Sequence, residues 1–242
     1  MTDAVADAAD YLAEGFKELI WPTRCVGCDL PGTLLCEECE AALPRIDPDQ
    51  ACPHCGAAHG VILCTECDPA KPNGGFPFQG ARAFGRFEGA LASMLVLYKD
   101  EGEKRLAPII ARLLAITAGS DWRSWADCIV FVPASADAFR RRGFDHMEQV
   151  ARAMAAQTHI ALLDVLARDK VVDQRKLDRQ DRAANAAGSF QLLPARALAL
   201  QDRNVLLIDD VFTTGATLSA AAQALIDAGA RAVRVVVAAR VW

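Results

Sequence analysis

The sequence predicts an α/β fold in which a doubly wound, mostly parallel sheet follows a small cysteine-rich domain. Two observations predict the sheet: strand-like and helical segments alternate from residue 81 onward, and two of the strands are almost wholly apolar. Strands of that kind lie at the centre of a parallel sheet, where helices cover both faces. A third observation, four Cys-x-x-Cys pairs within residues 25–67, predicts the separate small domain.

Four segments follow one another along the chain. Residues 1–20 carry apolar side chains at helical spacing, which predicts an amphipathic helix that docks on the protein itself rather than on a membrane. Residues 21–69 hold the cysteine pairs, and residues 70–80 are rich in proline and glycine, which predicts a linker. Residues 81–242 form the predicted α/β domain.

The elements of the α/β domain are predicted from their patterns. Each strand is a short apolar run, and each helix has apolar residues three or four positions apart. Pro133 ends one strand, and Gly229 stands where a glycine commonly ends a helix. The expected order is strand 81–87, helix 91–98, helix 106–118, strand 128–132, helix 147–157, strand 205–208, helix 218–228 and strand 233–237.

Composition excludes several classes of protein. Hydrophobic residues make up 52% of the chain and charged residues 24%, which is enough apolar surface for a core and argues against global disorder. No apolar run approaches the roughly 18 residues that cross a bilayer. Asp3, Asp7 and Asp10 occupy an amino terminus that lacks the pattern of a signal peptide. We therefore expect a cytoplasmic protein without a membrane span.

Eight of the nine cysteines form the four pairs. In a reducing cytosol such pairs act as metal ligands, and four thiolates can hold one tetrahedral Zn²⁺. We predict two structural Zn²⁺ sites; neighbouring pairs are expected to share a metal because their loops are short, although a crossed grouping stays open. Redox chemistry would need one pair on a βα unit. The predicted ligands are Cys25, Cys28, Cys36, Cys39, Cys52, Cys55, Cys64 and Cys67.

Charge is distributed unevenly along the chain. Residues 1–80 hold 13 acidic and 4 basic side chains, whereas the whole chain has a formal net charge of −5, so residues 81–242 are net positive. Affinity for nucleic acid comes chiefly from Lys and Arg that replace counterions. We therefore predict that the cysteine ribbons are structural or bind protein rather than DNA.

A second motif predicts a ligand site. The apolar strand 205–208 runs into two acids, and a turn rich in threonine and glycine precedes the next helix. Backbone N–H groups of such a turn, the helix N-terminus and the threonine hydroxyls suit a phosphate. The two carboxylates can accept hydrogen bonds from ribose hydroxyls or meet a hydrated Mg²⁺. The predicted sugar-phosphate site comprises Asp209, Asp210, Thr213, Thr214, Gly215, Ala216 and Thr217.

This motif resembles the phosphoribosyl pyrophosphate loop of the type I phosphoribosyltransferases. The run Val130-Phe131-Val132-Pro133-Ala134-Ser135 resembles that family's pyrophosphate loop, and Arg140-Arg141-Arg142-Gly143-Phe144 follows it. Lys99 and the set Gln174, Leu177, Arg182, Asn185 and Phe190 complete the resemblance. With the cysteine ribbons ahead of them, these motifs are similar to the ComF family of DNA-uptake (competence) proteins.

The resemblance implies a type I phosphoribosyltransferase-like domain that binds a phosphoribosyl pyrophosphate-like ligand with Mg²⁺. It also implies that residues 168–187 form a lid over the site. The implied residues on the pyrophosphate side are Pro133, Ala134, Ser135, Lys99, Arg140, Arg141, Arg142 and Arg182.

Two positions depart from the relatives' pattern. Asp145-His146 stands where ComF-like proteins often have Asn-Gln, and we expect His146 to be structural or solvated rather than catalytic. Thr213 stands where purine-salvage relatives often have an aspartate, so purine salvage is disfavoured.

Three functional hypotheses follow. The first is a ComF-like protein of DNA uptake or DNA utilisation that meets single-stranded DNA and DNA-processing proteins. The second is a metabolic phosphoribosyltransferase that acts on a small base or amine. The third is a sensor that binds the phosphoribosyl ligand without turnover. No residue of the sequence identifies a nucleophile or a general base, so the sequence leaves open whether the protein is an enzyme.

Overall fold

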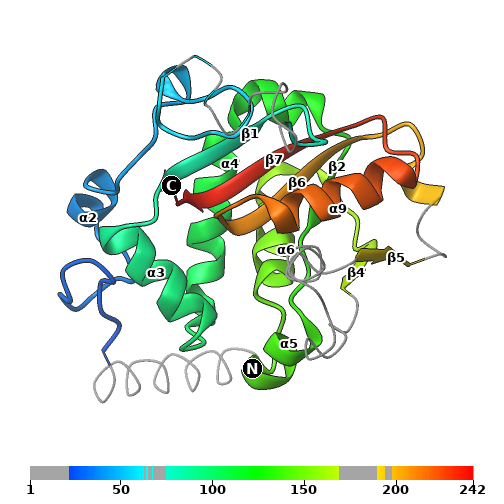
Figure 1. Cartoon of the computed structure of the whole chain (residues 1–242). Helices are drawn as coiled ribbons and strands as arrows, with labels where there is room; N and C mark the ends of the chain where they lie inside the picture. Colours follow the sequence, from blue (N-terminus) through cyan, green and yellow to red (C-terminus); the bar gives the residue numbers. More distant parts are fainter. Residues whose placement is uncertain are drawn as a thin grey trace, which may run out of the picture. The chain divides into compact units, whose positions relative to one another are not determined.

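The computed structural model describes residues 22–60, 62, 64, 67, 75–168, 190–193 and 198–241 (Figure 1). The chain divides into two compact units, Met1–Leu43 and Pro44–Trp242. The predicted helix 1–20, most of the predicted lid (169–187) and Arg182 lie outside the described residues. The boundary at residues 43 and 44 falls within the cysteine-rich segment that the sequence pattern groups as one domain.

The smaller unit is a cysteine loop followed by one helix, α2 (Glu37–Ala41). The backbone N–H of Cys25 donates to the carbonyl of Leu30 at 2.9 Å, which closes the loop over the first Cys-x-x-Cys pair. Cys36 begins the helix, and its sulfur accepts the N–H of Cys39 at 3.5 Å. α2 buries none of its own residues, as expected for a unit too small to build an apolar core.

The larger unit is built on a five-stranded sheet in the order β1-β7-β6-β2-β3, in which every neighbouring pair is parallel. The two central strands, β7 and β6, are rich in valine and leucine and almost entirely buried, as predicted for strands covered on both faces. The strands are β1 (Ala81–Arg86), β2 (Cys128–Phe131), β3 (Ala161–Leu162), β6 (Asn204–Phe212) and β7 (Ala232–Arg240); β4 (Leu166–Arg168) and β5 (Phe190–Leu192) form a separate antiparallel ribbon.

Helices lie on both faces of this sheet (Figure 1): α9 covers one face of β6 and β7, and α4 and α6 lie on the other. The doubly wound, mostly parallel fold is therefore confirmed. The helices are α3 (Gly89–Lys99), α4 (Ala107–Trp125), α5 (Ala136–Arg142), α6 (His146–Thr158) and α9 (Ala216–Asp227), with short 3₁₀ turns at Pro48–Gln50, Lys104–Leu106 and Leu198–Leu200.

Several elements differ from expectation, among them the strands β3, β4 and β5, which were not expected. α4 runs past the expected end to Trp125, with a kink at Gly119, where φ is 66°. α5 was not expected; it is a two-turn helix that Ser135 caps. β6 continues through Phe212 because it pairs with β7 as far as Arg240, so the two acids lie inside the strand rather than after it. Gly229 ends α9 with a positive φ of 97°, as predicted.

The second cysteine cluster belongs to the larger unit, and the segment that leads to it, residues 44–46, covers the β1 edge of the sheet. The N–H of Ile46 donates to Phe84 O at 2.9 Å, and the N–H of Arg86 donates to Pro44 O at 2.8 Å, so this segment pairs with edge strand β1. A Cβ atom on Gly85 would lie 2.5 Å from that same proline carbonyl, so the approach requires glycine. Cys52, Cys55 and Cys67 are buried in one core cluster with residues of β6 and β7.

Candidate functional site

Two adjacent buried carboxylates stand near the carboxyl end of β6. Asp209 is 8% exposed and Asp210 is 7% exposed. Asp209 Oδ1 accepts the N–H of Asp210 at 2.9 Å, and Asp210 Oδ1 accepts the N–H of Val211 at 2.7 Å. Ligands of open α/β sheets bind outside the carboxyl ends of the strands, and this pair lies close to that end of β6.

Two side chains from different helices meet Asp210. Lys99, the last residue of α3, forms an ion pair with Asp210 Oδ2. His146 Nε2 lies 3.2 Å from the same oxygen, and His146 is itself 5% exposed. Tyr98 donates its hydroxyl to the carbonyl of His146, which ties the end of α3 to the start of α6. Three elements therefore converge on one carboxylate oxygen.

Burial affects the two acids differently. Burial, reinforced by the neighbouring Asp210 charge, raises the pKa of Asp209 well above its usual value. Burial also acts to raise the pKa of Asp210, but the hydrogen bond with His146 and the charge on Lys99 outweigh it and hold that pKa below its usual value. The pair therefore consists of one firmly ionised carboxylate beside one that resists ionisation.

The turn after β6 leads into the N-terminus of α9. Gly215 precedes the helix with a φ of 82°, a conformation that favours glycine. Glycine has no side chain with which to cap a helix, so the first-turn N–H groups that follow Ala216 are available to an anion. Thr213 and Thr214 are exposed, and Thr214 Oγ1 accepts the N–H of Ala216 at 3.4 Å. The arrangement suits a phosphate beside the two acids.

A buried arginine braces the start of this turn. Arg240, at the end of β7, is 1% exposed, and its guanidinium lies 4.1 Å from the centre of the Phe212 ring. Its Nη1 donates to Phe212 O at 3.1 Å and to the carbonyl of Thr213. Sequence reasoning missed this residue because its partners lie far away in the chain.

The loop after β2 is already engaged by hydrogen bonds within the protein, and two of its neighbouring helices are capped there. The N–H of Ala134, a predicted pyrophosphate-side residue, donates to Asp145 Oδ2 at 2.7 Å. Asp145 Oδ1 also caps α6 by accepting the N–H of Met147 at 2.9 Å. Ser135 caps α5 by accepting the N–H of Ala138 at 3.2 Å, and Pro133 is half-buried just before it. Asp145 is thus a structural cap, which the sequence pattern alone did not assign.

The predicted basic residues are only partly brought to the acids. Lys99 is in contact with Asp210, as described above. Arg142 has a side chain that is 7% exposed, and its Nη2 lies 3.2 Å from Asp100 Oδ1. Arg140 pairs with Asp137 on the exposed face of α5, and Arg141 is exposed. His146 was expected to be structural or solvated, and it lies in the site. The sequence signal that could have indicated this was its position one residue after a helix cap.

The cysteines form two separate clusters. The sulfurs of each group lie within 4.8 Å of one another, and they group neighbouring pairs: Cys25, Cys28, Cys36 and Cys39 in one cluster, and Cys52, Cys55, Cys64 and Cys67 in the other. Sulfur–sulfur distances of 3.8 Å in the first and 3.5 Å in the second are near the roughly 3.8 Å that tetrahedral Zn–S bonds of about 2.3 Å require. Both clusters therefore fit a structural Zn²⁺ ion.

Each cluster also contains one thiol that ionises easily. Burial acts to raise the pKa of Cys25, but backbone N–H donors, led by that of Cys36, outweigh it and lower the pKa to about 6. The pKa of Cys52 is lowered to about 7 in the same way, chiefly by the N–H of Cys64. Because the thiolate is the form that binds metal, these N–H donors favour the loaded state.

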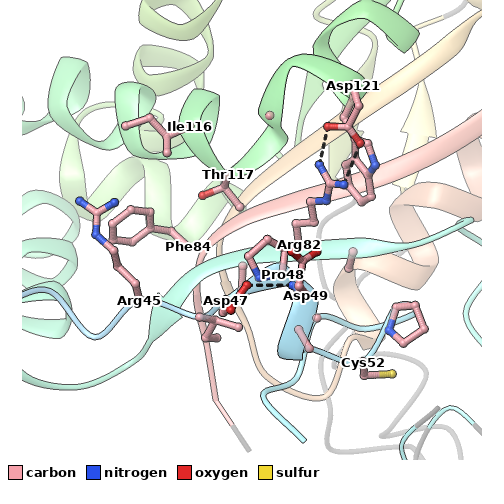
Figure 2. A pocket seen from close by; sticks show the side chains of 18 of the residues that line it. Arg45, Asp47, Pro48, Asp49, Cys52, Arg82, Phe84, Ile116, Thr117 and Asp121 are labelled. Carbon is pink, nitrogen blue, oxygen red and sulfur yellow. Dashed lines mark hydrogen bonds and ion pairs between the residues drawn. The ribbon is translucent and has the colours of Figure 1, made fainter. Parts of the chain in front are cut away.

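A cavity of about 790 Å³ lies elsewhere in the larger unit (Figure 2), lined by residues 45–56, β1 and the end of α4. Its two arginines are engaged: Arg82 makes bonds of 2.9 and 2.8 Å to Asp121, and Arg45 lies 4.9 Å from the centre of the Phe84 ring. The acids of β6 and the turn before α9 do not line it.

The chain is similar to known proteins over most of its length. A family model described as phosphoribosyl transferase domain matches residues 140–241. The chain is 28% identical over 226 residues to the DNA utilization protein YhgH of Escherichia coli K12, covering 88% of this chain and 95% of that protein. It is 25% identical over 202 residues to the competence protein ComFC of Streptococcus pneumoniae, covering 83% and 84%.

The glutamine phosphoribosylpyrophosphate amidotransferase structure from B. subtilis aligns with 17% identity and a TM-score of 0.39, covering 55% of this chain and 26% of that one. Across the part of the chain that the structure describes, no helix combines the length and apolarity needed to cross a membrane.

Proposed function

We propose that this chain, a homologue of the ComFC and YhgH proteins, acts in competence or DNA utilisation and binds a phosphoribosyl pyrophosphate-type ligand at the carboxyl end of β6. The observation that carries the proposal is the buried acid pair directly before a glycine turn and a helix N-terminus. Carboxylates for a ribose and N–H groups for a phosphate then stand side by side on one continuous stretch, Asp209 to Thr217.

The residues have separate tasks in this proposal. Lys99 and His146 hold Asp210 as an oriented carboxylate before any ligand arrives. Asp209 resists ionisation in the free protein, so a divalent cation that accompanies the ligand would favour its charged form. Mg²⁺, when bound with the ligand, would supply charge that neutralises a pyrophosphate. Thr213, Thr214 and the first turn of α9 would bind the 5-phosphate end.

A sensor that binds this ligand without turnover is the second candidate, and two contacts favour it. The Ala134 N–H is already bonded to Asp145, and Arg142 is paired with Asp100, so these two groups are engaged before any pyrophosphate binds. An enzyme that stabilises a leaving pyrophosphate would need such donors aimed at it.

Partners and location are part of the same proposal. Residues 81–242 are net positive, which is compatible with contact to single-stranded DNA, whereas residues 1–80 are strongly acidic and suit a structural role or a protein partner. Two Cys₄ zinc sites require reduced thiols, which supports a cytoplasmic location.

The test is calorimetric titration of phosphoribosyl pyrophosphate with Mg²⁺ into the zinc-loaded protein. Saturable binding is expected in the wild type and should be lost in the Asp209→Ala/Asp210→Ala double variant, provided that circular dichroism shows it folded. Asp202→Ala removes an exposed carboxylate elsewhere and should bind as the wild type does. Absence of binding in the wild type would refute the proposed ligand.

Two further measurements separate the candidates. Pyrophosphate release in a screen of small bases and amines would identify a transferase, and binding without release would identify a sensor. Binding of a fluorescent single-stranded oligonucleotide that weakens steeply with salt would support the DNA-related role.

A further inference from the structure

The second cysteine cluster is joined to the turn before α9 by a row of aromatic rings. The row begins at His54, which stands between Cys52 and Cys55 in the third Cys-x-x-Cys pair. His54 Nε2 accepts the backbone N–H of Phe76 at 3.0 Å. The metal-ligating turn therefore fixes the backbone at the start of the segment that leads into β1.

Stacked rings extend the row. The His54 ring is stacked on Phe76 and on Phe78, with centroid distances of 5.7 and 5.8 Å. Phe76 and Phe78 are nearly parallel, 4.9 Å apart with 8° between their planes. Phe78 is 2% exposed, so this is a packed part of the core although proline and glycine surround it in the sequence. Stacked and edge-on aromatic pairs stabilise a packed arrangement beyond the apolar area that they bury.

The row of rings ends at the turn between β6 and α9. Phe76 meets Phe212 edge-on at 5.4 Å and 80°, and Phe78 meets it at 6.2 Å and 87°. Phe76 also lies directly against Gly215: a Cβ atom placed there would be 2.6 Å from Phe76 Cε1 and 2.7 Å from Phe212 Cε2. The position of the Phe76 ring therefore limits where the backbone between Phe212 and Gly215 can go.

We propose that His54 is a positioning residue: the metal-bound turn Cys52–Cys55 holds it against Phe76, and Phe76 holds the Phe212–Gly215 backbone in its ligand-binding shape. The inference rests on the proposed function, because it takes that backbone to be part of the ligand site. It assigns the second Zn²⁺ site a task in ligand affinity in addition to folding.

The first arm of the test needs no ligand. Amide hydrogen exchange is followed in peptides that cover Phe212–Leu218 for the wild type, His54→Ala and His59→Ala. His59 is an exposed histidine in the same cysteine cluster and serves as the matched control. The rate of amide hydrogen exchange in these peptides should rise about 5-fold or more in His54→Ala, whereas it should stay unchanged in the β7 peptides of that variant. All peptides of the His59→Ala protein should exchange as they do in the wild type.

The second arm is calorimetry with phosphoribosyl pyrophosphate and Mg²⁺ on the same proteins. His54→Ala should weaken binding by about 5-fold or more, and His54→Gln, which keeps a hydrogen-bond acceptor, should recover part of the loss. Zinc content is measured for every variant. If His54→Ala releases zinc, the Phe76→Ala variant tests the inference instead, because it interrupts the row of rings without changing the metal-ligating turn.

The two arms separate two possible failures. A wild type that binds no ligand refutes the proposed function, while hydrogen exchange still reports whether the row supports the turn. Turn peptides that exchange in His54→Ala and Phe76→Ala as they do in His59→Ala overturn the inference, whatever the calorimetry shows.

Discussion

Asp209 and Asp210 are neighbours in the chain and equally buried, yet their pKa values move in opposite directions. Among the described residues, Lys99 and His146 make direct side-chain contacts with Asp210, whereas the charge of Lys99 acts on Asp209 only from a greater distance. Asp209 has backbone support but no such partner among the described residues, so burial and its neighbour's charge disfavour its ionised form. In the proposed function, a divalent cation that arrives with the ligand would complete the ionisation of Asp209.

Replacing Asp209 by Asn should therefore stabilise the free protein. A raised pKa means that the folded protein holds this proton more tightly than the unfolded chain, so the free energy of unfolding falls as pH rises from about 4 toward the folded pKa. Asp209→Asn should remove that fall and gain about 1 kcal/mol or more near pH 8, as measured by urea unfolding between pH 4.5 and 8.

Asp49→Asn, at an exposed carboxyl, provides the comparison and should keep the wild-type decline with pH. The Asp210 contribution has the opposite sign: its lowered pKa stabilises the fold above its ordinary pKa and is lost as pH falls below it. Equal pH profiles for Asp209→Asn and the wild type would contradict the prediction.

At the scale of elements, the junction of β6 and α9 depends on one glycine. Gly215 combines a positive φ with aromatic rings that occupy the place of a Cβ atom, so an alanine there would meet both backbone strain and a steric clash. We expect Gly215→Ala to cost about 2 kcal/mol or more in unfolding free energy and to weaken ligand binding.

Gly102 offers a matched control, because its φ of 79° is close to the 82° of Gly215 and a Cβ there would meet open space. Gly102→Ala should cost only the backbone strain, about 1 kcal/mol. Thermal unfolding of the two variants separates backbone strain from the steric clash. Equal losses of unfolding free energy would show that the aromatic rings move aside easily.

Local patterns predicted most of the elements, whereas partners distant in the chain decided the rest. The apolar run of β6 and the Thr/Gly turn before α9 could be read directly from the sequence, as could the neighbouring cysteine pairs. The true end of β6 could not, because it depends on pairing between Phe212 and Arg240. Nor could the contact of His54 with Phe76, since the sequence around Phe76 reads as a linker.

At the scale of the whole molecule, two chemically similar cysteine clusters have different surroundings. The first lies in the small unit, whose described residues bury few apolar side chains, and the second is part of the core of the larger unit. Zinc at the second site should therefore stabilise the sheet that carries the acids, whereas zinc at the first should stabilise its own loop.

This difference predicts the response to losing each metal. The wild type should contain two Zn²⁺ ions per chain by elemental analysis. Cys55→Ser should lower the melting temperature of the larger unit by about 10 °C or more, and Cys28→Ser should leave it within a few degrees. An equal fall in both variants would show that the two sites stabilise one cooperative structure.

The strand order has a consequence for synthesis. The earliest strand of the sheet, β1, pairs with the latest, β7, so its hydrogen bonds to the sheet cannot form while the ribosome is still translating the residues between them. Until β7 emerges, the β7-facing edge of β1 stays open and is exposed to pairing with other nascent chains. The segment that begins at Pro44, already made by then, can shield the other side of β1 during this wait.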